Sequence, residues 1–309
     1  MTEPQSAADV LMVRPANFCA NAQTMASNRF QRASDAFQRV HAQALDEFDA
    51  LAVALRHAGV RVHVVEDTPV PQKPDAIFPN NWFSSHVDGT VVLYPMLAPN
   101  RRPERRRDIL DLLDQRSGFD LRRVIDLSTY EREERYLEGT GSLVLDRCNR
   151  VAYACHSPRT DAALLAEFAR QMDYEIVAFD AGDESGQPIY HTNVLLSIGT
   201  DAAVVCTESI RSDQRRHVAD ALRATGHRLV EITHSQMHNF AANAMELTTS
   251  SGNRVLALSA RAAASLTKRQ TALLNDWCGA FVTTPIPTVE TFGGGSVRCM
   301  LAEVAMQPA

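Results

Sequence analysis

The stretch that decides the fold is "HTNVLLSIGTDAAVVCTES", at residues 191–209. Polar residues open it, an apolar run follows, and a second apolar run comes after the turn residues "GTD". Two apolar runs separated by a short turn of this kind are typical of a β-hairpin. The stretch therefore predicts a hairpin that is entered through polar residues.

The same pattern occurs four more times along the chain. In most copies Asn or Gly stands near the start of a mainly apolar run, and the starts recur at roughly 50–60 residues, a spacing typical of repeated supersecondary units. The other copies are "NNWFSSHVDGTVVLYPM" (80–96), "EGTGSLVLDRCNRVAYACHS" (138–157), "AANAMELTTSSGNRVLALSA" (241–260) and "GGGSVRCMLAEV" (293–304).

Amphipathic segments lie between these hairpins, and short apolar runs follow most of them. Apolar residues at helical spacing predict helices. The amphipathic segments are 35–59, 160–172, 214–226 and 260–277, and the apolar runs after them include 61–67, 175–180 and 228–233. The repeated unit is therefore a hairpin, a helix and a further strand.

Five such units, closed in a circle, give a five-bladed α/β propeller of ββαβ-like repeats. The strand expected within residues 10–18 completes the last unit, which otherwise runs out of strands at the C-terminus. No Pro- or Ser-rich linker interrupts the pattern, so we predict a single domain over residues 1–309. The alternative is an ordinary two-domain α/β protein.

Composition narrows the class of protein. The chain has 309 residues, a hydrophobic share of 45% and a net charge of −6. This charge argues against general binding of nucleic acid. The basic run at 100–108 is a local exception, and we interpret it as a solvated loop and helix start.

Localisation signals are also missing from the sequence. No apolar run approaches the roughly 20 residues that span a membrane, and the first ten residues do not have the pattern of a secretory signal. The six cysteines form no C-x-x-C pair, so we interpret most of them as buried packing residues of a reducing compartment. We predict a cytoplasmic protein without nucleic-acid or membrane partners, and homo-oligomerisation stays open.

Four motifs, one in each of four repeats, resemble the arginine deiminase and amidinotransferase superfamily, whose fold is the pentein propeller. The closest resemblance is to arginine-deiminase-related citrulline utilisation hydrolases. The motifs are "FPNNWFS" (78–84), "LEGTGSLVLDR" (137–147), "YHTNV" (190–194) and "GGGSVRCM" (293–300).

The resemblance implies a catalytic Cys299, His191 and Glu138. In the superfamily the thiol attacks the central carbon of a guanidinium, the histidine protonates the departing amine, and water hydrolyses the covalent adduct. The chemistry is reasonable in itself, because a thiol with a reference pKa of about 8.5 needs a base or a cation nearby. Backbone N–H groups around Gly294 and Gly295 are expected to stabilise the tetrahedral intermediate. We expect Cys299 to lie in the last strand.

Two positions depart from the arginine deiminase pattern. Arginine deiminases grip the guanidinium with two aspartates, and here those positions are Asn81 and Asn193. A guanidinium only donates hydrogen bonds, whereas a ureido group also has an acceptor oxygen. Amides can serve both functions, so the asparagines favour a ureido substrate such as citrulline. The alternative is that both are turn residues.

Two arginines are candidates for the substrate carboxylate. Arg159, in "SPRT", resembles the arginine that has this role in deiminases, and Arg101 matches a second such position, for which Arg102 competes. His234 and His238 are four apart but lack a third ligand in the sequence pattern, and no phosphate-binding glycine loop is present. We therefore predict neither a metal nor a cofactor.

The sequence thus predicts a cysteine-dependent hydrolase that converts citrulline to ornithine, ammonia and carbon dioxide. The nearest alternatives keep the same residues but act on arginine, methylated arginine or agmatine, or transfer the group to an amine. An alternative of another class is a non-catalytic amino-acid-binding protein.

Overall fold

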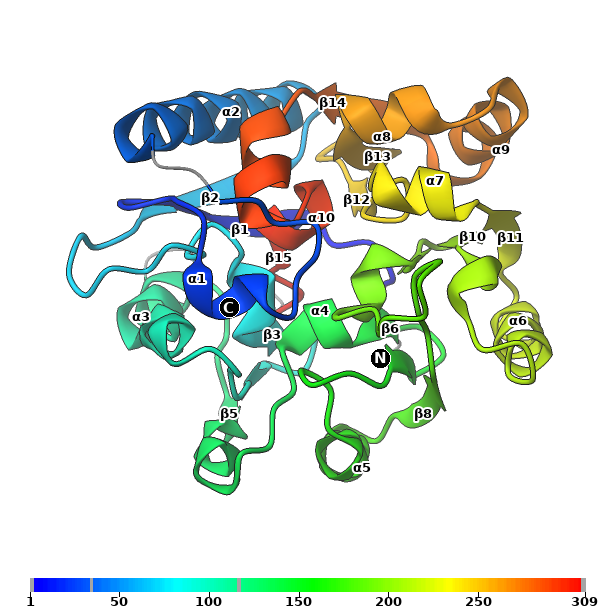
Figure 1. The fold of residues 1–309 in the computed structure, drawn as a ribbon, viewed down its shortest axis with the longest axis horizontal. Coiled ribbons are helices and arrows are strands. Elements are labelled where there is room, and N and C mark those ends of the chain that lie inside the picture. Colours follow the sequence, from blue (N-terminus) through cyan, green and yellow to red (C-terminus); the bar gives the residue numbers. More distant parts are fainter. Residues whose placement is uncertain (1–2, 34–35, 116–117, 307–309) are drawn as a thin grey trace.

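Five small β-sheets form the frame of the molecule (Figure 1). The structure is a computed structural model that describes residues 3–33, 36–115 and 118–306. Within these ranges each sheet has three strands. In sheet order the strands are β3 (Phe83–Ser85), β4 (Thr90–Leu93) and β5 (Arg123–Asp126); β6 (Val144–Asp146), β7 (Val151–Cys155) and β8 (Glu175–Phe179); β9 (Leu196–Ile198), β10 (Ala202–Val205) and β11 (Arg228–Glu231); β12 (Met245–Thr248), β13 (Arg254–Ser259) and β14 (Ala280–Thr284); and β15 (Ala302–Glu303), β1 (Asp9–Arg14) and β2 (Arg61–Glu66).

All five sheets share one connectivity. The first strand pairs antiparallel with the middle strand, and the middle strand pairs parallel with the third. One or two helices link the middle strand to the third, as a parallel connection requires. In the same sheet order these helices are α3 (Arg107–Gln115), α5 (Ala162–Met172), α6 (Arg215–Ala224), α8 (Ala260–Ser265) with α9 (Lys268–Cys278), and α2 (Phe37–His57).

Helix α2 illustrates why these segments are helical and where they pack. Val40, Ala44, Phe48 and Leu51 are buried and stand three or four residues apart, so they form one apolar face. Asp161 caps the N-terminus of helix α5, and its carboxylate accepts two backbone N–H groups of the first turn. Figure 1 shows the long helices at the periphery, with the short helices α4 (Gly139–Ser142) and α10 (Val297–Met300) near the centre.

Each sheet contacts its neighbours along the chain. β6 contacts β9, and β9 contacts β12; α4 contacts β3, and α10 contacts β13. β15 in turn contacts β3, which joins the last sheet to the first. The mixed α/β class and the five three-stranded sheets expected from the repeats are therefore confirmed. None of the helices in the described ranges has the length and apolarity that a membrane crossing needs.

The sheet made from both ends of the chain has the expected pairing. β1 pairs antiparallel with β15 through Val10 and Leu11, and parallel with β2 over its whole length. Within the expected segment 10–18 the strand ends at Arg14. The first and last repeats therefore share one sheet.

A one-turn helix immediately precedes the first strand of four sheets. These helices are η1 (Pro79–Asn81), α4, η4 (Thr192–Val194) and α10. The remaining short helices are α1 (Ala22–Met25), η2 (Pro99–Glu104), η3 (Ser128–Glu133), η5 (Thr207–Ser209), α7 (His234–His238) and η6 (Val289–Gly293).

The expectation that Cys299 lies in a strand is wrong, because it lies in α10. The backbone N–H groups of Cys299 and Met300 both bond to the carbonyl of Ser296, which closes one helical turn before β15 begins. The preceding Gly294 has a φ of +67°, a conformation that favours glycine. The chain thus turns sharply before the thiol instead of running straight into the strand.

Candidate active site

The one-turn helices bring the candidate catalytic residues together. Glu138 and His191 are the residues that cap α4 and η4. Asn81 ends η1, and Cys299 lies within α10. Because each helix stands at the start of its own repeat, four side chains from distant parts of the chain meet at one site.

Glu138 is fully buried and accepts hydrogen bonds on both oxygens. Oε2 accepts from His191 Nε2 at 2.8 Å and from Arg159 Nη1 at 3.2 Å, and Oε1 accepts from the backbone of Leu97 at 3.1 Å. Burial alone would raise the pKa of Glu138, but Arg159, His191 and Arg101 outweigh it and hold that pKa well below its usual range. The carboxylate is therefore ionised at neutral pH.

His191 is neutral at the same pH. Burial lowers the pKa of His191 to about 4, and the bond to Glu138, which acts in the opposite direction, does not overcome this effect. An ionised carboxylate only accepts hydrogen bonds, so Nε2 of His191 carries the ring proton. Nδ1 then keeps a free lone pair, and this arrangement lets the ring accept a proton and later return it.

The thiol of Cys299 has two side-chain amides beside it. Asn243 Nδ2 lies 3.2 Å from Sγ, and Asn193 Nδ2 lies 3.5 Å from it. Asn193 thus contacts the thiol and does not line the cavity beside it. Asn243 was not among the residues predicted from the sequence, although it stands near the start of the fourth repeat.

Asn81 lines the cavity, and Arg101 fixes the orientation of its amide. Arg101 is only 2% exposed, so the interpretation of residues 100–108 as solvated is wrong at this residue. Its guanidinium bonds to both carboxylate oxygens of Glu104 and donates from Nη1 to Asn81 Oδ1 at 3.0 Å. A guanidinium cannot accept a hydrogen bond. Asn81 therefore presents Oδ1 to Arg101, and its Nδ2 has no partner among the described residues.

Arg159 also lines the cavity, where it already has partners. Besides Glu138, it bonds to Ser27 Oγ from Nε and Nη2, at 3.2 and 2.7 Å. Its guanidinium also lies over the Tyr190 ring, 5.1 Å from the ring centre. Both arginines named from the sequence thus reach the site, and their role in binding a carboxylate stays a prediction.

Gly294 and Gly295 line the cavity beside Cys299. The carbonyl of Gly294 accepts from Tyr190 Oη at 2.5 Å and from Asn28 Nδ2 at 3.2 Å. A methyl group on Gly294 would lie 2.5 Å from the Asn28 side chain, and one on Gly295 would lie 3.1 Å from Cys299 Cβ. Larger residues at either position would displace the wall of the cavity.

The cavity itself is small and covered. Its volume of about 10 Å³ is enough for about one water molecule. Residues 21–31 contribute Thr24 and Asn28 to its lining, and Asn21 Nδ2 donates to the buried Asp75 at 2.8 Å. The cavity in this structure is therefore too small for an amino-acid ligand.

Two further residues shape the site. Asp75 lines the cavity, and its Oδ1 has no partner among the described residues; burial raises the pKa of Asp75. Gly141 lies against both Asn81 and His191, since an added methyl group would stand 2.5 Å from Asn81 Nδ2 and 2.8 Å from His191 Nδ1. The motif "EGTG" contains Gly141, but only the folded contacts show why a glycine is needed there.

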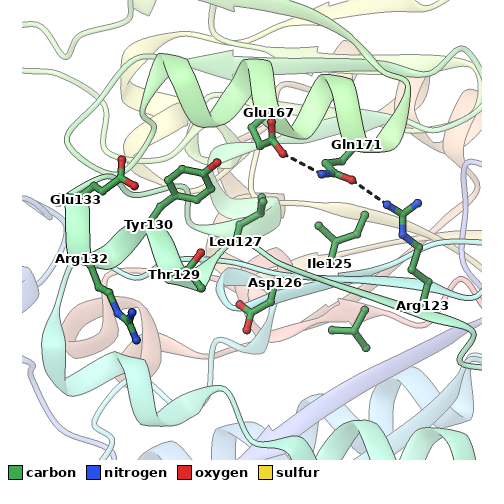
Figure 2. A pocket seen from close by; sticks show the side chains of 11 residues that line it. Arg123, Ile125, Asp126, Leu127, Thr129, Tyr130, Arg132, Glu133, Glu167 and Gln171 are labelled. Carbon is green, nitrogen blue, oxygen red and sulfur yellow. Dashed lines mark hydrogen bonds between the residues drawn. The ribbon is translucent and has the colours of Figure 1, made fainter.

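A second, surface hollow has a different character. It lies between β5 and α5, where Figure 2 shows Arg123, Gln171 and Glu167 joined by hydrogen bonds. Arg123 Nη2 donates to Gln171 at 2.8 Å, and Gln171 Nε2 donates to Glu167 at 2.9 Å. Neither a cysteine nor a histidine lines this hollow, so it does not offer the chemistry of the Cys299 cavity.

One group of potential metal ligands is present in the described part of the chain. Its ligand atoms, from Cys206, Glu208 and His234, lie within 4.8 Å of one another. None of these residues lines the Cys299 cavity. His234 was noted from the sequence for its spacing to His238, and α7 places both on a helix. That the chain needs no metal or cofactor stays a prediction.

Comparison with known proteins was made by sequence and by structure. The family model described as "N,N dimethylarginine dimethylhydrolase, eukaryotic" matches residues 14–306. No curated protein sequence matches the chain closely enough to count as a relative.

Several solved structures have the same fold. ArgZ, an arginine dihydrolase from the ornithine-ammonia cycle in cyanobacteria, superposes with a TM-score of 0.74 at 17% identity over 97% of this chain and 41% of its own. This chain thus spans about two fifths of ArgZ. The substrate-bound N-terminal domain of ArgZ, a cysteine-to-serine mutant, gives 0.73 at 17% identity over 96% of this chain and 98% of its own.

A more distant match has a covalent adduct in its site. A histidine-to-glycine variant of dimethylarginine dimethylaminohydrolase, solved as an adduct with S-methyl-L-thiocitrulline, gives a TM-score of 0.63 at 13% identity, over 98% of this chain and 99% of its own. At such identities the structural matches establish the fold, and the family model establishes the family. The chain belongs to the N,N-dimethylarginine dimethylhydrolase family, within the arginine deiminase/amidinotransferase (pentein) superfamily, whose hydrolases act on guanidino C–N bonds.

Proposed function

We propose that the chain hydrolyses citrulline to ornithine, ammonia and carbon dioxide, with Cys299 as the nucleophile. The orientation of the Asn81 side chain is the observation that supports citrulline as the substrate. Arg101 holds Asn81 Oδ1, so the amide offers an N–H donor to the cavity that it lines. A ureido oxygen can accept that bond, whereas a guanidinium has no acceptor for it. A buried donor without a partner costs about 1–3 kcal/mol.

Asp75 complements this donor. Its unpartnered Oδ1 accepts an N–H of the substrate, so Asn81 and Asp75 together match the C=O and NH₂ of one ureido group. Arg159 or Arg101 binds the α-carboxylate as a charged donor.

The placement of His191 and Glu138 supports the following reaction. Neutral His191 takes the proton of the Cys299 thiol, and the thiolate attacks the ureido carbon. His191 then gives that proton to the departing ammonia, which leaves an S-linked carbamoyl adduct. Water attacks this adduct, and the product carbamate decomposes to ornithine and carbon dioxide. Glu138 remains ionised throughout and stabilises the imidazolium form of His191.

We also infer that the five sheets close into a five-bladed propeller and that residues 1–309 form one catalytic domain. The contact between β15 and β3 supports closure, because it joins the last sheet to the first. Residues 1–2, 34–35, 116–117 and 307–309 lie outside the described residues. A cytoplasmic location remains part of this proposal.

Arginine is the second candidate substrate. The unpartnered Oδ1 of Asp75 favours it, and ArgZ, which has the same fold, is described as an arginine dihydrolase. An enzyme that carries arginine through citrulline to ornithine would use the same Cys299 twice. Methylated arginines are a third candidate through the family description.

Product release from citrulline, arginine and dimethylarginine in parallel tests the proposal. Ornithine and ammonia from citrulline, abolished in Cys299→Ala, are the expected result. Arginine turnover that stops at citrulline would contradict the proposal that citrulline is the substrate. It would leave the proposed role of Cys299 as nucleophile unchanged. Binding of citrulline without any product would favour a non-catalytic amino-acid-binding protein.

Asn81→Asp tests the substrate argument directly. The carboxylate replaces the N–H donor by an acceptor, so kcat/KM for citrulline should fall about 10–100-fold, the effect of one lost buried hydrogen bond. The ratio of arginine to citrulline turnover should rise. Unchanged kinetics with both substrates would show that Asn81 does not select between them.

A further inference from the structure

We propose that Asn243 is a positioning residue for the nucleophile, whose side-chain amide donates a hydrogen bond to Cys299 Sγ and stabilises the thiolate. Because this role requires Cys299 to be the nucleophile, it rests on the function proposed above. No sequence motif pointed to Asn243, which follows two alanines in the segment 241–260.

The hydrogen-bond partners of Asn243 fix which side-chain atom faces the thiol. Nδ2 lies 3.2 Å from Cys299 Sγ and 3.0 Å from the backbone carbonyl of Asn193. A backbone carbonyl only accepts hydrogen bonds, so the atom beside it must be the NH₂ group. One hydrogen of Nδ2 is directed to Asn193, and the second is available to Sγ.

The backbone holds this amide in place. Asn243 is fully buried, and its carbonyl accepts from the backbone N–H of Arg298, one residue before the thiol. Its own N–H donates to the carbonyl of Phe240 at 2.8 Å. Phe240 has a φ of +61°, a conformation that is rare for a bulky residue and is kept only where surrounding contacts enforce it. Asn243 is thus tied to α10 by both backbone and side chain.

The thiol depends on such neutral donors for its stabilisation. His191 is neutral, and its Nε2 is committed to Glu138. The Arg298 guanidinium bonds to the carbonyl of Leu301 and to Glu303. Within the described ranges the side-chain donors to Sγ are Asn243 and Asn193. A donor binds a thiolate more strongly than a thiol, so Asn243 favours the reactive form.

Other titratable or charged groups surround the same thiol. They are His191 and Tyr190 next to η4, Arg298 on α10, and Asp75, Arg101 and Arg159 of the cavity. Substitution of Asn243 leaves all of these groups in place. The difference in alkylation midpoint between the wild type and the variant therefore reports the effect of the Asn243 amide alone.

The test is the pH dependence of Cys299 alkylation by iodoacetamide, followed by peptide mass spectrometry to separate it from the exposed Cys148. The alkylation midpoint of the wild type is the reference value. Asn243→Ala should raise it by about 1–2 pH units, the value of one hydrogen bond to a charged acceptor. The isosteric Asn243→Asp, which adds a negative charge, should raise it at least as much.

Asn239→Ala is the matched control, because Asn239 bonds to Ser235 and Arg261 and not to the thiol. A purely structural role would lower the denaturation midpoint of the Asn243 variants without moving the alkylation midpoint, and that result would overturn the proposal. If Asn243→Ala fails to fold, Asn243→Asp carries the same test, and an unmoved alkylation midpoint in that variant would also overturn the proposal. Lack of citrulline turnover with a shifted alkylation midpoint would contradict the proposed function and leave the role of Asn243 intact.

Discussion

Two buried polar clusters meet at α10, and they differ in how completely their groups are paired. We define the salt-bridge cluster as Glu3, Arg147, Arg298 and Glu303, and the amide cluster as Asn81, Asn193 and Asn243. In the salt-bridge cluster Arg147 contacts Glu3 and both oxygens of Glu303, and Arg298 also contacts Glu303. In the amide cluster each side chain keeps one polar atom without a partner among the described residues.

The two clusters differ in pairing, and we infer that one serves stability and the other serves function, although both contact the short helix α10. Buried polar groups in proteins are nearly always paired, because an unpaired one costs free energy. We therefore expect the paired cluster to contribute to the stability of the fold, and the unpaired amides to serve the nucleophile and the ligand of the proposed function. Arg298 belongs to the first cluster and the adjacent Cys299 touches the second. Substitutions in one cluster should therefore change stability, and those in the other should change turnover.

Arg147→Ala should give the largest effect on stability. It leaves the buried carboxylate of Glu3 without its arginine and removes one of the two arginines that pair with Glu303, so the free energy of unfolding should fall by about 3–5 kcal/mol. Urea unfolding measures this loss, and kcat per folded molecule should stay within about twofold. The exposed Arg122, paired with Asp120, provides the control: Arg122→Ala should leave urea unfolding nearly unchanged. A large drop in kcat for folded Arg147→Ala would contradict the inference that the salt-bridge cluster affects stability and not turnover.

Gly141→Ala should reduce turnover with less effect on stability. The added methyl group would push against Asn81 Nδ2 and His191 Nδ1, and misplacement of reacting groups by about 1 Å can cost about 10²-fold in rate. Steady-state kcat/KM with citrulline measures the effect. Gly182→Ala, where the nearest atom would be 3.3 Å away, is the matched control and should keep its activity. Equal kinetics for the two variants would mean that Gly141 is not needed for the site's geometry.

Glu3→Gln should give the smallest effect, and its difference from the wild type should shrink as the pH falls below about 4.5. The charges of Arg147 and His86 overcome the effect of burial and lower the pKa of Glu3 from 4.5 to about 2. Because the folded-state pKa is depressed, this stabilisation is present above about pH 4.5 and is lost as the pH falls toward 2. Between pH 5 and 3 the wild type should lose about 1–3 kcal/mol more unfolding free energy than the variant. Parallel losses in urea unfolding at both pH values would show that Glu3 is not the titrating group.

His191 adds a second, separate dependence on pH. Its folded-state pKa of about 4 lies below the reference value of 6.5, so the folded protein binds fewer protons between these values than the unfolded chain does. The free energy of unfolding therefore decreases as the pH is lowered through this window, in both the wild type and Glu3→Gln. The difference in unfolding free energy between the wild type and Glu3→Gln therefore reports the titration of Glu3 alone.

The repeats made much of the fold predictable from sequence. Hairpin turns and apolar runs are local signals, and the five sheets follow them closely. One-turn helices were missed because four residues are too few to show a helical period. That omission placed Cys299 in a strand, although the residue itself was identified by its motif.

Long-range polar pairing was the least predictable part. Arg147 and Glu303 are 156 residues apart, and no local pattern connects them. Arg101 carried a usable signal, since Glu104 follows it by one helical turn and pairs with it. Asn243 had no motif around it, so only its distance to Sγ reveals it. The roles of all these residues in catalysis remain predictions.

The pairing of β1 with β15 has a consequence for synthesis of the chain. On the ribosome Asp9–Arg14 emerges well before Ala302–Glu303, so the sheet that they share forms only after the residues between them have been made. Contacts of such large sequence separation form slowly. Cys299 is translated just before β15, so under the proposed function a nascent chain gains its reactive site only when this sheet can assemble.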